Sequence, residues 1–332
     1  QRSYSSGFTR ACGLKVRIPG TFRTREMKKD LISMTDLSTE DVWGLIEEAR
    51  DLKKGGASRM LEGRTLALLF QKPSLRTRVS FDVGMKQLGG HTVYLSPAEV
   101  GMGPRESIAD VARVLSRYVD GIVARTFGHA LVVELAQHAS VPVINGLTDR
   151  THPCQIMADV LTFEEHRGPI EGRVVAWSGD GNNVAASLAL AAASVSANFV
   201  IASPEGYELP HELIRRAQEL ASASGATLRQ VQDPEDATSG CDVVYTDTWV
   251  SMGQESKAEQ RVRDFERYQV THQLMENSAP GAIFMHPLPA HHGEEVSAGM
   301  LEHTQSAVFD QAENRLHAQK AVMEKVIAER PG

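Results

Sequence analysis

The stretch TLALLFQKPSLRTR, residues 65–78, joins an apolar run to the start of a helix. The run up to Phe70 predicts a buried strand, and Pro73 and Ser74 predict the turn that ends it. The next helix begins with hydroxyl groups and arginines. Its free backbone amides and the positive end of its dipole favour binding of an anion. A capped helix with solvated arginines is the alternative that this segment alone leaves open.

Two arginines of this helix, Arg76 and Arg78, lie two positions apart in the sequence. A helix turns about 100° per residue and therefore sends their side chains about 200° apart. Only one of them can face an anion. The other is expected to make a structural contact.

Outward from this stretch, short apolar runs alternate with amphipathic helical patterns. This alternation is typical of parallel sheets with crossover helices. Strands are predicted at 65–70, 92–95, 121–125, 141–145, 174–178, 199–202, 228–231, 243–246, 283–286 and 308–310, and helices at 42–54, 106–119, 183–195, 211–222 and 312–328. The predicted fold class is α/β, with two doubly wound parallel-sheet domains joined by interdomain helices near residues 151–168.

The division of the chain follows from these patterns. The first 25 residues hold six basic residues and no acidic one, so residues 1–26 are interpreted as an upstream extension or the remnant of a targeting segment. We expect a first domain at 27–150 and a second at 151–317. The C-terminal helix, about residues 318–332, is expected to pack back on the first domain.

Composition excludes several classes of protein. The chain has 332 residues, 42% of them hydrophobic and 23% charged, with a formal net charge of −7. This charge argues against a nucleic-acid partner. The uncharged run 184–203 is rich in alanine and serine, so a buried helix and strand explain it better than a membrane span. Three cysteines make no disulfide framework and favour a reducing compartment, with the cytoplasm preferred and an organelle matrix as the alternative.

Other candidate residues follow predicted strands. Arg125 ends one strand, where open α/β sheets place ligand groups. His152 and Gln155, after the next strand, are i and i+3 and share one helical face, where they could jointly polarise a carbonyl. Asp247 also follows a strand and suits recognition of an amino group. A lone histidine is more often structural, so His152 is a candidate site residue only in combination with Arg76 and Arg125.

Three further motifs concern a cofactor, a turn and a metal. Residues 179–183, GDGNN, lack the third glycine of a dinucleotide loop, which argues against a nicotinamide cofactor. The two prolines of 286–289, HPLP, predict an unusual turn with a possible cis bond. The pair His291 and His292, followed by two glutamates, matches no standard zinc spacing, so a solvated polar loop is favoured and no metal is expected.

Together these segments resemble the aspartate/ornithine carbamoyltransferase family, from about Asp30 onward. SLRTR at 74–78 is similar to the family's carbamoyl-phosphate loop, HPCQ at 152–155 to its His-Pro-x-Gln motif, and Asp247 with SMG at 251–253 to the mobile loop of the ornithine branch. The segment ENRLH at 313–317 also resembles that branch.

The resemblance implies transfer of a carbamoyl group from carbamoyl phosphate to the side-chain amine of L-ornithine, without a cofactor. It implies a homotrimer, or a multiple of one, with active sites at subunit boundaries. The implied carbamoyl-phosphate ligands are Ser74, Leu75, Arg76, Thr77, Arg125, His152 and Gln155. The implied ornithine ligands are Asn183, Asp247, Ser251, Met252, Pro287, Leu288 and Arg315. Among these, Arg76, Arg125, His152 and Asp247 are expected to be catalytic.

The chain departs from the family at two positions. Pro287 replaces the cysteine of the ornithine branch's His-Cys-Leu-Pro motif, and Gly101 replaces a glutamine that reaches into the neighbouring subunit. We expect Arg105 to reach across instead. Two alternatives stay open, namely a carbamoyltransferase for a modified ornithine or another amine, and a carbamoyl-phosphate-binding protein with impaired turnover.

Overall fold

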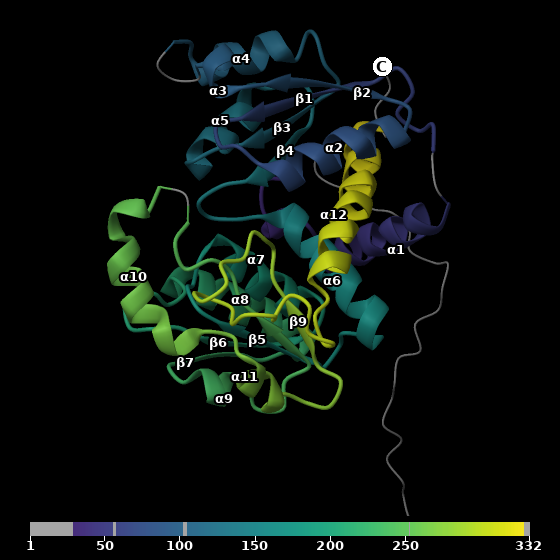
Figure 1. Cartoon of the computed structure of the whole chain (residues 1–332). Coiled ribbons are helices and arrows are strands. Elements are labelled where there is room, and N and C mark those ends of the chain that lie inside the picture. The colour runs from purple at the N-terminus through teal and green to yellow at the C-terminus, as the bar shows by residue number, and fades with distance from the viewer. Residues whose placement is uncertain (1–28, 56–57, 102–104, 252, 329–332) are drawn as a thin grey trace, which may run out of the picture.

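The computed structural model describes residues 29–55, 58–101, 105–251 and 253–328 (Figure 1). The extension at 1–26, Cys12 and Met252 therefore lie outside the described residues. In the described part of the chain, no helix is both long enough and apolar enough to cross a membrane.

A first, four-stranded sheet forms the upper part of the molecule in Figure 1. Its strands are β1 (Thr65–Phe70), β2 (His91–Leu95), β3 (Gly121–Arg125) and β4 (Val143–Leu147), all parallel in the order β2-β1-β3-β4. Alternate residues of β1 point to opposite faces, so Leu66 and Leu68 pack in one core cluster and Ala67 and Leu69 in another. Helices α4 (Ile108–Leu115) and α5 (His129–His138) cover the second of these faces.

A second, five-stranded parallel sheet forms the lower part, in the order β7-β6-β5-β8-β9. Its strands are β5 (Val174–Ser178), β6 (Asn198–Ala202), β7 (Leu228–Val231), β8 (Val243–Tyr245) and β9 (Ile283–Met285). Helices α7 (Asn183–Ser194) and α8 (His211–Ser224) cover one face, and α9 (Pro234–Thr238) and α11 (His272–Glu276) cover the other. Both sheets thus carry helices on both faces, which confirms the predicted fold class.

Three helices join the two sheets. They are α1 (Thr39–Gly55), α6 (Pro153–Arg167) and α12 (Val308–Met323), and α12 packs against α1, α6 and α2 (Leu75–Gln87). Figure 1 shows α12 running beside α6 from the lower sheet to the upper one. One continuous apolar core includes residues of these helices and of both sheets. Short helices α3 (Pro97–Val100) and α10 (Ala258–Phe265) lie outside this core.

Several predicted elements shift in the structure. The predicted strand at 308–310 is wrong, because Val308 opens α12. The sheet edge beside β9 is occupied by a single bridge between Phe284 and Ser306, after which the chain turns into the helix. The strand predicted at 141–145 begins only at Val143, where pairing with Ile122 starts. The helix predicted at 106–119 is limited to α4, which Ser107 caps by accepting a hydrogen bond from the amide of Asp110.

Candidate active site

One open pocket of about 860 Å³ lies where the carboxyl ends of the strands of both sheets meet. Of the substrate ligands that the resemblance implies, all that the structure describes line this pocket. They are Ser74, Leu75, Arg76, Thr77, Arg125, His152, Gln155, Asn183, Asp247, Ser251, Pro287, Leu288 and Arg315.

The start of α2 forms one wall. Ser74 is its N-cap, and its side chain accepts a hydrogen bond from the amide of Thr77. Arg76 lines the pocket, whereas the Arg78 guanidinium lies 3.7 Å from the centre of the Tyr94 ring. The two arginines therefore diverge as their spacing predicts, one toward the pocket and one into a structural contact.

Two more guanidinium groups meet at the same wall. Arg125, at the end of β3, and Arg315, on α12, both donate to the Thr77 hydroxyl oxygen, at 3.3 and 3.0 Å. Burial lowers the pKa of Arg125 to about 10, and the charges of Arg315 and Arg76 act in the same direction. The Nε atoms of both Arg125 and Arg315 are buried and have no hydrogen-bond partner among the described residues. Cations crowded in this way favour binding of an anion.

His152 and Gln155 stand at the start of α6. His152 is the residue before Pro153, and its backbone amide donates to the Ser187 hydroxyl at 2.9 Å. Burial, and then the neighbouring arginines, hold the pKa of His152 well below its usual value, so the ring is neutral at neutral pH. Gln155 accepts a hydrogen bond from Arg315 at 2.7 Å. Arg315, which was expected among the ornithine ligands, thus contacts two of the residues expected for carbamoyl phosphate, Thr77 and Gln155.

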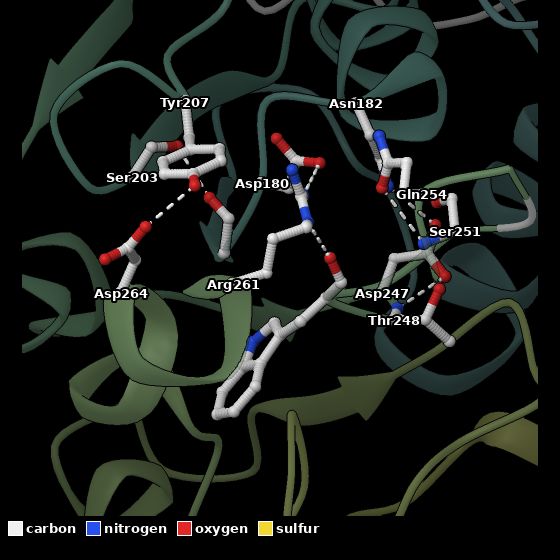
Figure 2. Close-up of polar contacts among 12 residues, drawn as sticks. Asp180, Asn182, Ser203, Tyr207, Asp247, Thr248, Ser251, Gln254, Arg261 and Asp264 are labelled. Atoms are coloured by element: carbon white, nitrogen blue, oxygen red, sulfur yellow. Dashed lines mark hydrogen bonds and ion pairs between the residues drawn. The ribbon is translucent and has the colours of Figure 1, made fainter. Parts of the chain in front are cut away.

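Asp247 forms the opposite wall, just after β8. Its carboxylate accepts from the Asn182 side chain at 2.8 Å and from the amide of Thr248 at 2.8 Å (Figure 2). Burial raises its pKa, although the nearby His286 acts in the opposite direction. Asn182 was missed at the sequence level. An asparagine directly before a predicted helix is a typical N-cap, which is the pattern that could have identified Asn182. In the structure its side-chain oxygen caps α7 and its side-chain nitrogen donates to Asp247.

After Asp247, the residues Val250, Ser251 and Gln254 also line the pocket. The amide of Ser251 donates to the Gln254 side chain at 3.1 Å, which is a local contact. Arg261 of α10 anchors the base of this segment, because it donates to the carbonyl of Trp249 and pairs with Asp180 (Figure 2). Arg261 also lines the pocket, and no sequence pattern pointed to it.

The turn after β9 closes the pocket. The peptide bond between Leu288 and Pro289 is cis, as the two prolines suggested, and Leu288 has a φ of 57°. The amide of Leu288 donates to His286 Nδ1 at 2.9 Å, so the proton of this imidazole is on Nε2, which faces Glu295 at 3.2 Å. This contact orients the backbone of Pro287 and Leu288 at the pocket wall.

The solvated loop expected at His291 is only partly observed. His291 is 46% exposed, but the Glu295 side chain is fully buried and accepts hydrogen bonds from His286 and from the amide of His291. Ligand atoms of His291, Glu294 and Glu295 lie within 4.8 Å of one another, close enough in principle for a cation. The two hydrogen bonds to Glu295 already give this carboxylate a structural role.

The glycine loop at 179–183 is shaped by packing. The Gly181 amide donates to the carbonyl of Tyr207 at 2.8 Å, and a Cβ at Gly181 would lie 2.6 Å from the backbone of Glu208 and Leu209. Only glycine permits this approach.

Lys72 is a further pocket residue that the sequence did not single out, and its Nζ lies 4.4 Å from the centre of the Phe127 ring.

Comparison with known proteins gives a consistent result. Residues 29–165 match the family model "Aspartate/ornithine carbamoyltransferase, carbamoyl-P binding domain", and residues 171–326 match "Aspartate/ornithine carbamoyltransferase, Asp/Orn binding domain". The chain is similar to ornithine carbamoyltransferases of Brucella suis, with 52% identity, and Pyrococcus abyssi, with 50% identity. Each match spans 299 residues, 89% of this chain and 94% of the relative.

Solved structures agree. The ornithine carbamoyltransferase of Pyrococcus furiosus has a TM-score of 0.88 and 48% identity, over 91% of this chain and 98% of that one. The enzyme of Thermus thermophilus has a TM-score of 0.83 and 43% identity, over 90% and 99% of the two chains.

Proposed function

Because the chain belongs to the aspartate/ornithine carbamoyltransferase family, we propose that it transfers the carbamoyl group of carbamoyl phosphate to the side-chain amine of L-ornithine, giving L-citrulline and phosphate. One observation carries this proposal. A single pocket has the guanidinium groups of Arg76, Arg125 and Arg315 at one wall and the carboxylate of Asp247 at the other. The first wall suits a phosphate dianion and the second suits an ammonium group.

Carbamoyl phosphate binds at the start of α2 in this proposal. Its phosphate meets Arg76, Arg125 and the amides at 74–77, and its carbonyl meets His152 and the Thr77 hydroxyl. Arg315 contacts Thr77 and Gln155, so we assign it to this substrate as well. The positive charges stabilise the departing phosphate.

Ornithine binds between Asp247 and the turn at Pro287 and Leu288. Asp247, Asn183, Ser251 and Met252 hold its α-amine and α-carboxylate, while the backbone carbonyls of the turn face its side-chain amine. Asn183 donates to the carbonyl of Thr148 in the structure. The second N–H of this amide remains to meet a substrate carboxylate.

The chemical step needs no covalent intermediate. The uncharged amine nitrogen attacks the carbamoyl carbon, the bond from that carbon to the phosphate oxygen breaks, and phosphate leaves with the electron pair. The amine loses one proton before attack and another afterwards. Holding the substrates in line can supply about 7–11 kcal/mol of the barrier. Each hydrogen bond to the developing oxyanion contributes about 2.7–4 kcal/mol.

The loss of the first proton is the step that Pro287 affects. A primary ammonium group has a pKa of about 10.4, so little of the amine is uncharged at neutral pH. Pro287 offers a carbonyl oxygen but no ionisable group. Binding of ornithine therefore depends less on the replaced cysteine than amine activation does.

The functional assembly is a homotrimer, or a multiple of one, with each active site completed by a neighbour. In support of this, α2 and the edge strand β2 expose the apolar residues Leu75, Val79 and Val93. A groove of about 240 Å³ beside Gly101 and the half-exposed Phe127 gives a second copy a place to dock. Arg105 is exposed beside it and is the side chain that reaches across.

The reaction belongs to amino-acid metabolism, with citrulline serving arginine biosynthesis. A relative in Pyrococcus furiosus, 49% identical, is named an anabolic ornithine carbamoyltransferase. We place the enzyme in the cytoplasm, because the described cysteines, Cys154 and Cys241, are free and buried. An organelle matrix has the same reducing character, and residues 1–26 would then be a transit segment.

A citrulline colour assay on the purified protein tests the function directly. Citrulline should form readily from carbamoyl phosphate and ornithine, and little N-α-acylcitrulline should form from carbamoyl phosphate and an N-α-acylated ornithine, because an acylated α-amine carries no charge for Asp247 to pair with. A preference for the acylated substrate would replace the proposal with a carbamoyltransferase for a modified ornithine. Tight binding of carbamoyl phosphate without citrulline would indicate the impaired binding protein that Pro287 and Gly101 make conceivable.

A further inference from the structure

A buried carboxylate lies directly behind the pocket. Asp159 is one helical turn after Gln155 on α6, is 3% exposed, and is absent from the pocket wall. It accepts hydrogen bonds from Gln155 Nε2 at 2.8 Å, from Gln311 Nε2 at 2.7 Å and from the Tyr245 hydroxyl at 3.0 Å. A buried acid with three donors is a costly arrangement that an apolar residue could have replaced.

The bond to Gln155 decides which way its amide stands. A carboxylate only accepts hydrogen bonds, so the NH2 end of Gln155 must face Asp159. The oxygen end must then face the pocket, where Arg315 donates to it at 2.7 Å. Burial raises the pKa of Asp159 to about 6, which still leaves the group mostly ionised at neutral pH.

Arg315 cannot fix this orientation alone. Its guanidinium lines the pocket and also contacts Thr77, so a bound phosphate competes with Gln155 for it. Asp159 lies outside the pocket, and no substrate can draw it away. Its other partners fix it from two further elements, because Tyr245 belongs to β8 and Gln311 belongs to α12. Gln311 also accepts from the amide of His286, which precedes the turn at Pro287.

We propose that Asp159 is a positioning residue that keeps the Gln155 carbonyl oxygen turned into the pocket, so that the site selects a substrate whose reacting group carries an N–H donor. This inference rests on the proposed function and deepens it. A carbamoyl group has such a donor. An acetyl group has a methyl in the same place and offers the Gln155 oxygen no donor, so it makes one hydrogen bond fewer in the site.

The test compares carbamoyl phosphate with acetyl phosphate, because both molecules carry the same phosphate group and have nearly the same shape. The quantity measured is the discrimination ratio, the inhibition constant of acetyl phosphate divided by the dissociation constant of carbamoyl phosphate. Asp159→Leu removes every acceptor at this position, so the Gln155 oxygen is no longer held toward the N–H of carbamoyl phosphate. The ratio should then fall about tenfold, the worth of one hydrogen bond to a buried group. The KM for ornithine should change far less than the affinity for carbamoyl phosphate.

Two variants serve as controls. Asp159→Asn keeps an oxygen that can accept from Gln155, and should hold the ratio within about threefold of the original. Tyr245→Phe removes a different donor from the same carboxylate and should leave the ratio unchanged. Because Asp159→Leu strands the Tyr245 hydroxyl and can fail to fold, the double variant Asp159→Leu with Tyr245→Phe is made beside it, with thermal unfolding as the check.

The outcomes separate cleanly. An unchanged ratio in either folded leucine variant overturns the proposal, while an active wild-type enzyme leaves the function standing. If neither leucine variant folds, Asp159→Asn decides: a ratio within about threefold of the wild type supports the proposal, whereas a fall of about tenfold with the acceptor still present overturns it. If the wild-type protein neither binds carbamoyl phosphate nor forms citrulline, the proposed function is wrong and this inference goes with it.

Discussion

Thr77 and Ser251 line the same pocket from opposite sides, but the protein holds them in different ways. The Thr77 side chain is buried and joins Arg125 and Arg315, which lie 48 and 238 residues away in the sequence. The Ser251 amide bonds to Gln254, three residues away, and the next amide described, that of Gly253, bonds to Glu255. The anion side is assembled by the tertiary fold, and the amine side ends in a locally held segment.

This difference assigns separate tasks to the two sides. A site already crowded with cations has its charge in place before the first substrate arrives, so binding requires little rearrangement. A locally held segment can move when ornithine enters and can close over it. Substitutions on the anion side should therefore abolish binding, and those on the amine side should alter selectivity and rate.

The largest effect is expected for Arg76→Ala. Loss of a charge-assisted contact to the phosphate should weaken carbamoyl-phosphate binding at least about a hundredfold, the equivalent of about 2.7 kcal/mol. Arg78→Ala is the matched control. It removes the same charge from the same helical turn, but the Arg78 side chain lies against Tyr94 and not in the pocket. Titration calorimetry would measure both. Equal losses in the two variants would contradict the division between pocket and structural arginines.

Next comes Asp247→Asn, on the amine side. The KM for ornithine should rise about thirtyfold, because the charged partner of an ammonium group is lost. The pKa of Asp247 is raised by burial, and only its ionised form attracts an ammonium group. Ornithine binding in the wild-type protein should therefore strengthen as pH rises through that pKa, and the variant should lack this limb. A variant whose profile follows the wild type would show that another group reads the amine.

Mixing two inactive proteins tests whether the anion side is shared between subunits. Arg76→Ala and Arg105→Ala proteins, dissociated and reassembled together in equal amounts, should recover about a quarter of the wild-type activity. Random assembly gives one site in four both an intact Arg76 and a neighbour's intact Arg105. Activity at the sum of the separate parents would rule out a shared site, as would full activity in a diluted monomer.

A smaller change is expected for Pro287→Cys. A thiol beside Asp247, with a usual pKa of about 8.5, could adjust the proton balance of the attacking amine. Turnover near neutral pH should rise severalfold, or the pH profile should move to lower pH, while the KM for ornithine hardly changes. Turnover measured from about pH 6 to pH 10 at saturating carbamoyl phosphate would decide. Superimposable profiles would show that the thiol is dispensable here.

The smallest effect is expected for thiol reagents on the wild-type protein. Burial raises the pKa of both Cys154 and Cys241 to about 12, so neither forms the reactive thiolate at neutral pH. Activity should survive a thiol-specific disulfide reagent, whereas Pro287→Cys should become sensitive to it. Rapid inactivation of the wild type, protected by carbamoyl phosphate, would instead reveal an opening of the anion side around Cys154.

The sequence predicted the anion side better than the amine side. The loop around Arg76 is local, because strand, turn and helix cap follow one another within 14 residues. Arg315 was expected to contact ornithine, whereas we propose it for carbamoyl phosphate, because the packing of α12 against α2 and α6 brings it to Thr77. Asn182, Arg261 and Asp159 were missed for the same reason. Their contacts join segments that periodicity treats separately, so a local pattern does not reveal their partners, even for Asn182, which has the local signal of a helix N-cap.

The position of α12 affects the order in which the protein can be made. This helix supplies Arg315 to the pocket and covers α1 and α2, which were synthesised more than 200 residues earlier. At about 5–20 residues per second, a ribosome needs over ten seconds to reach it. During that interval the apolar faces of α1 and α2 that α12 later buries are exposed. The first half of the chain therefore depends on a late segment, and nascent chains that stall before residue 308 should be good clients for a chaperone.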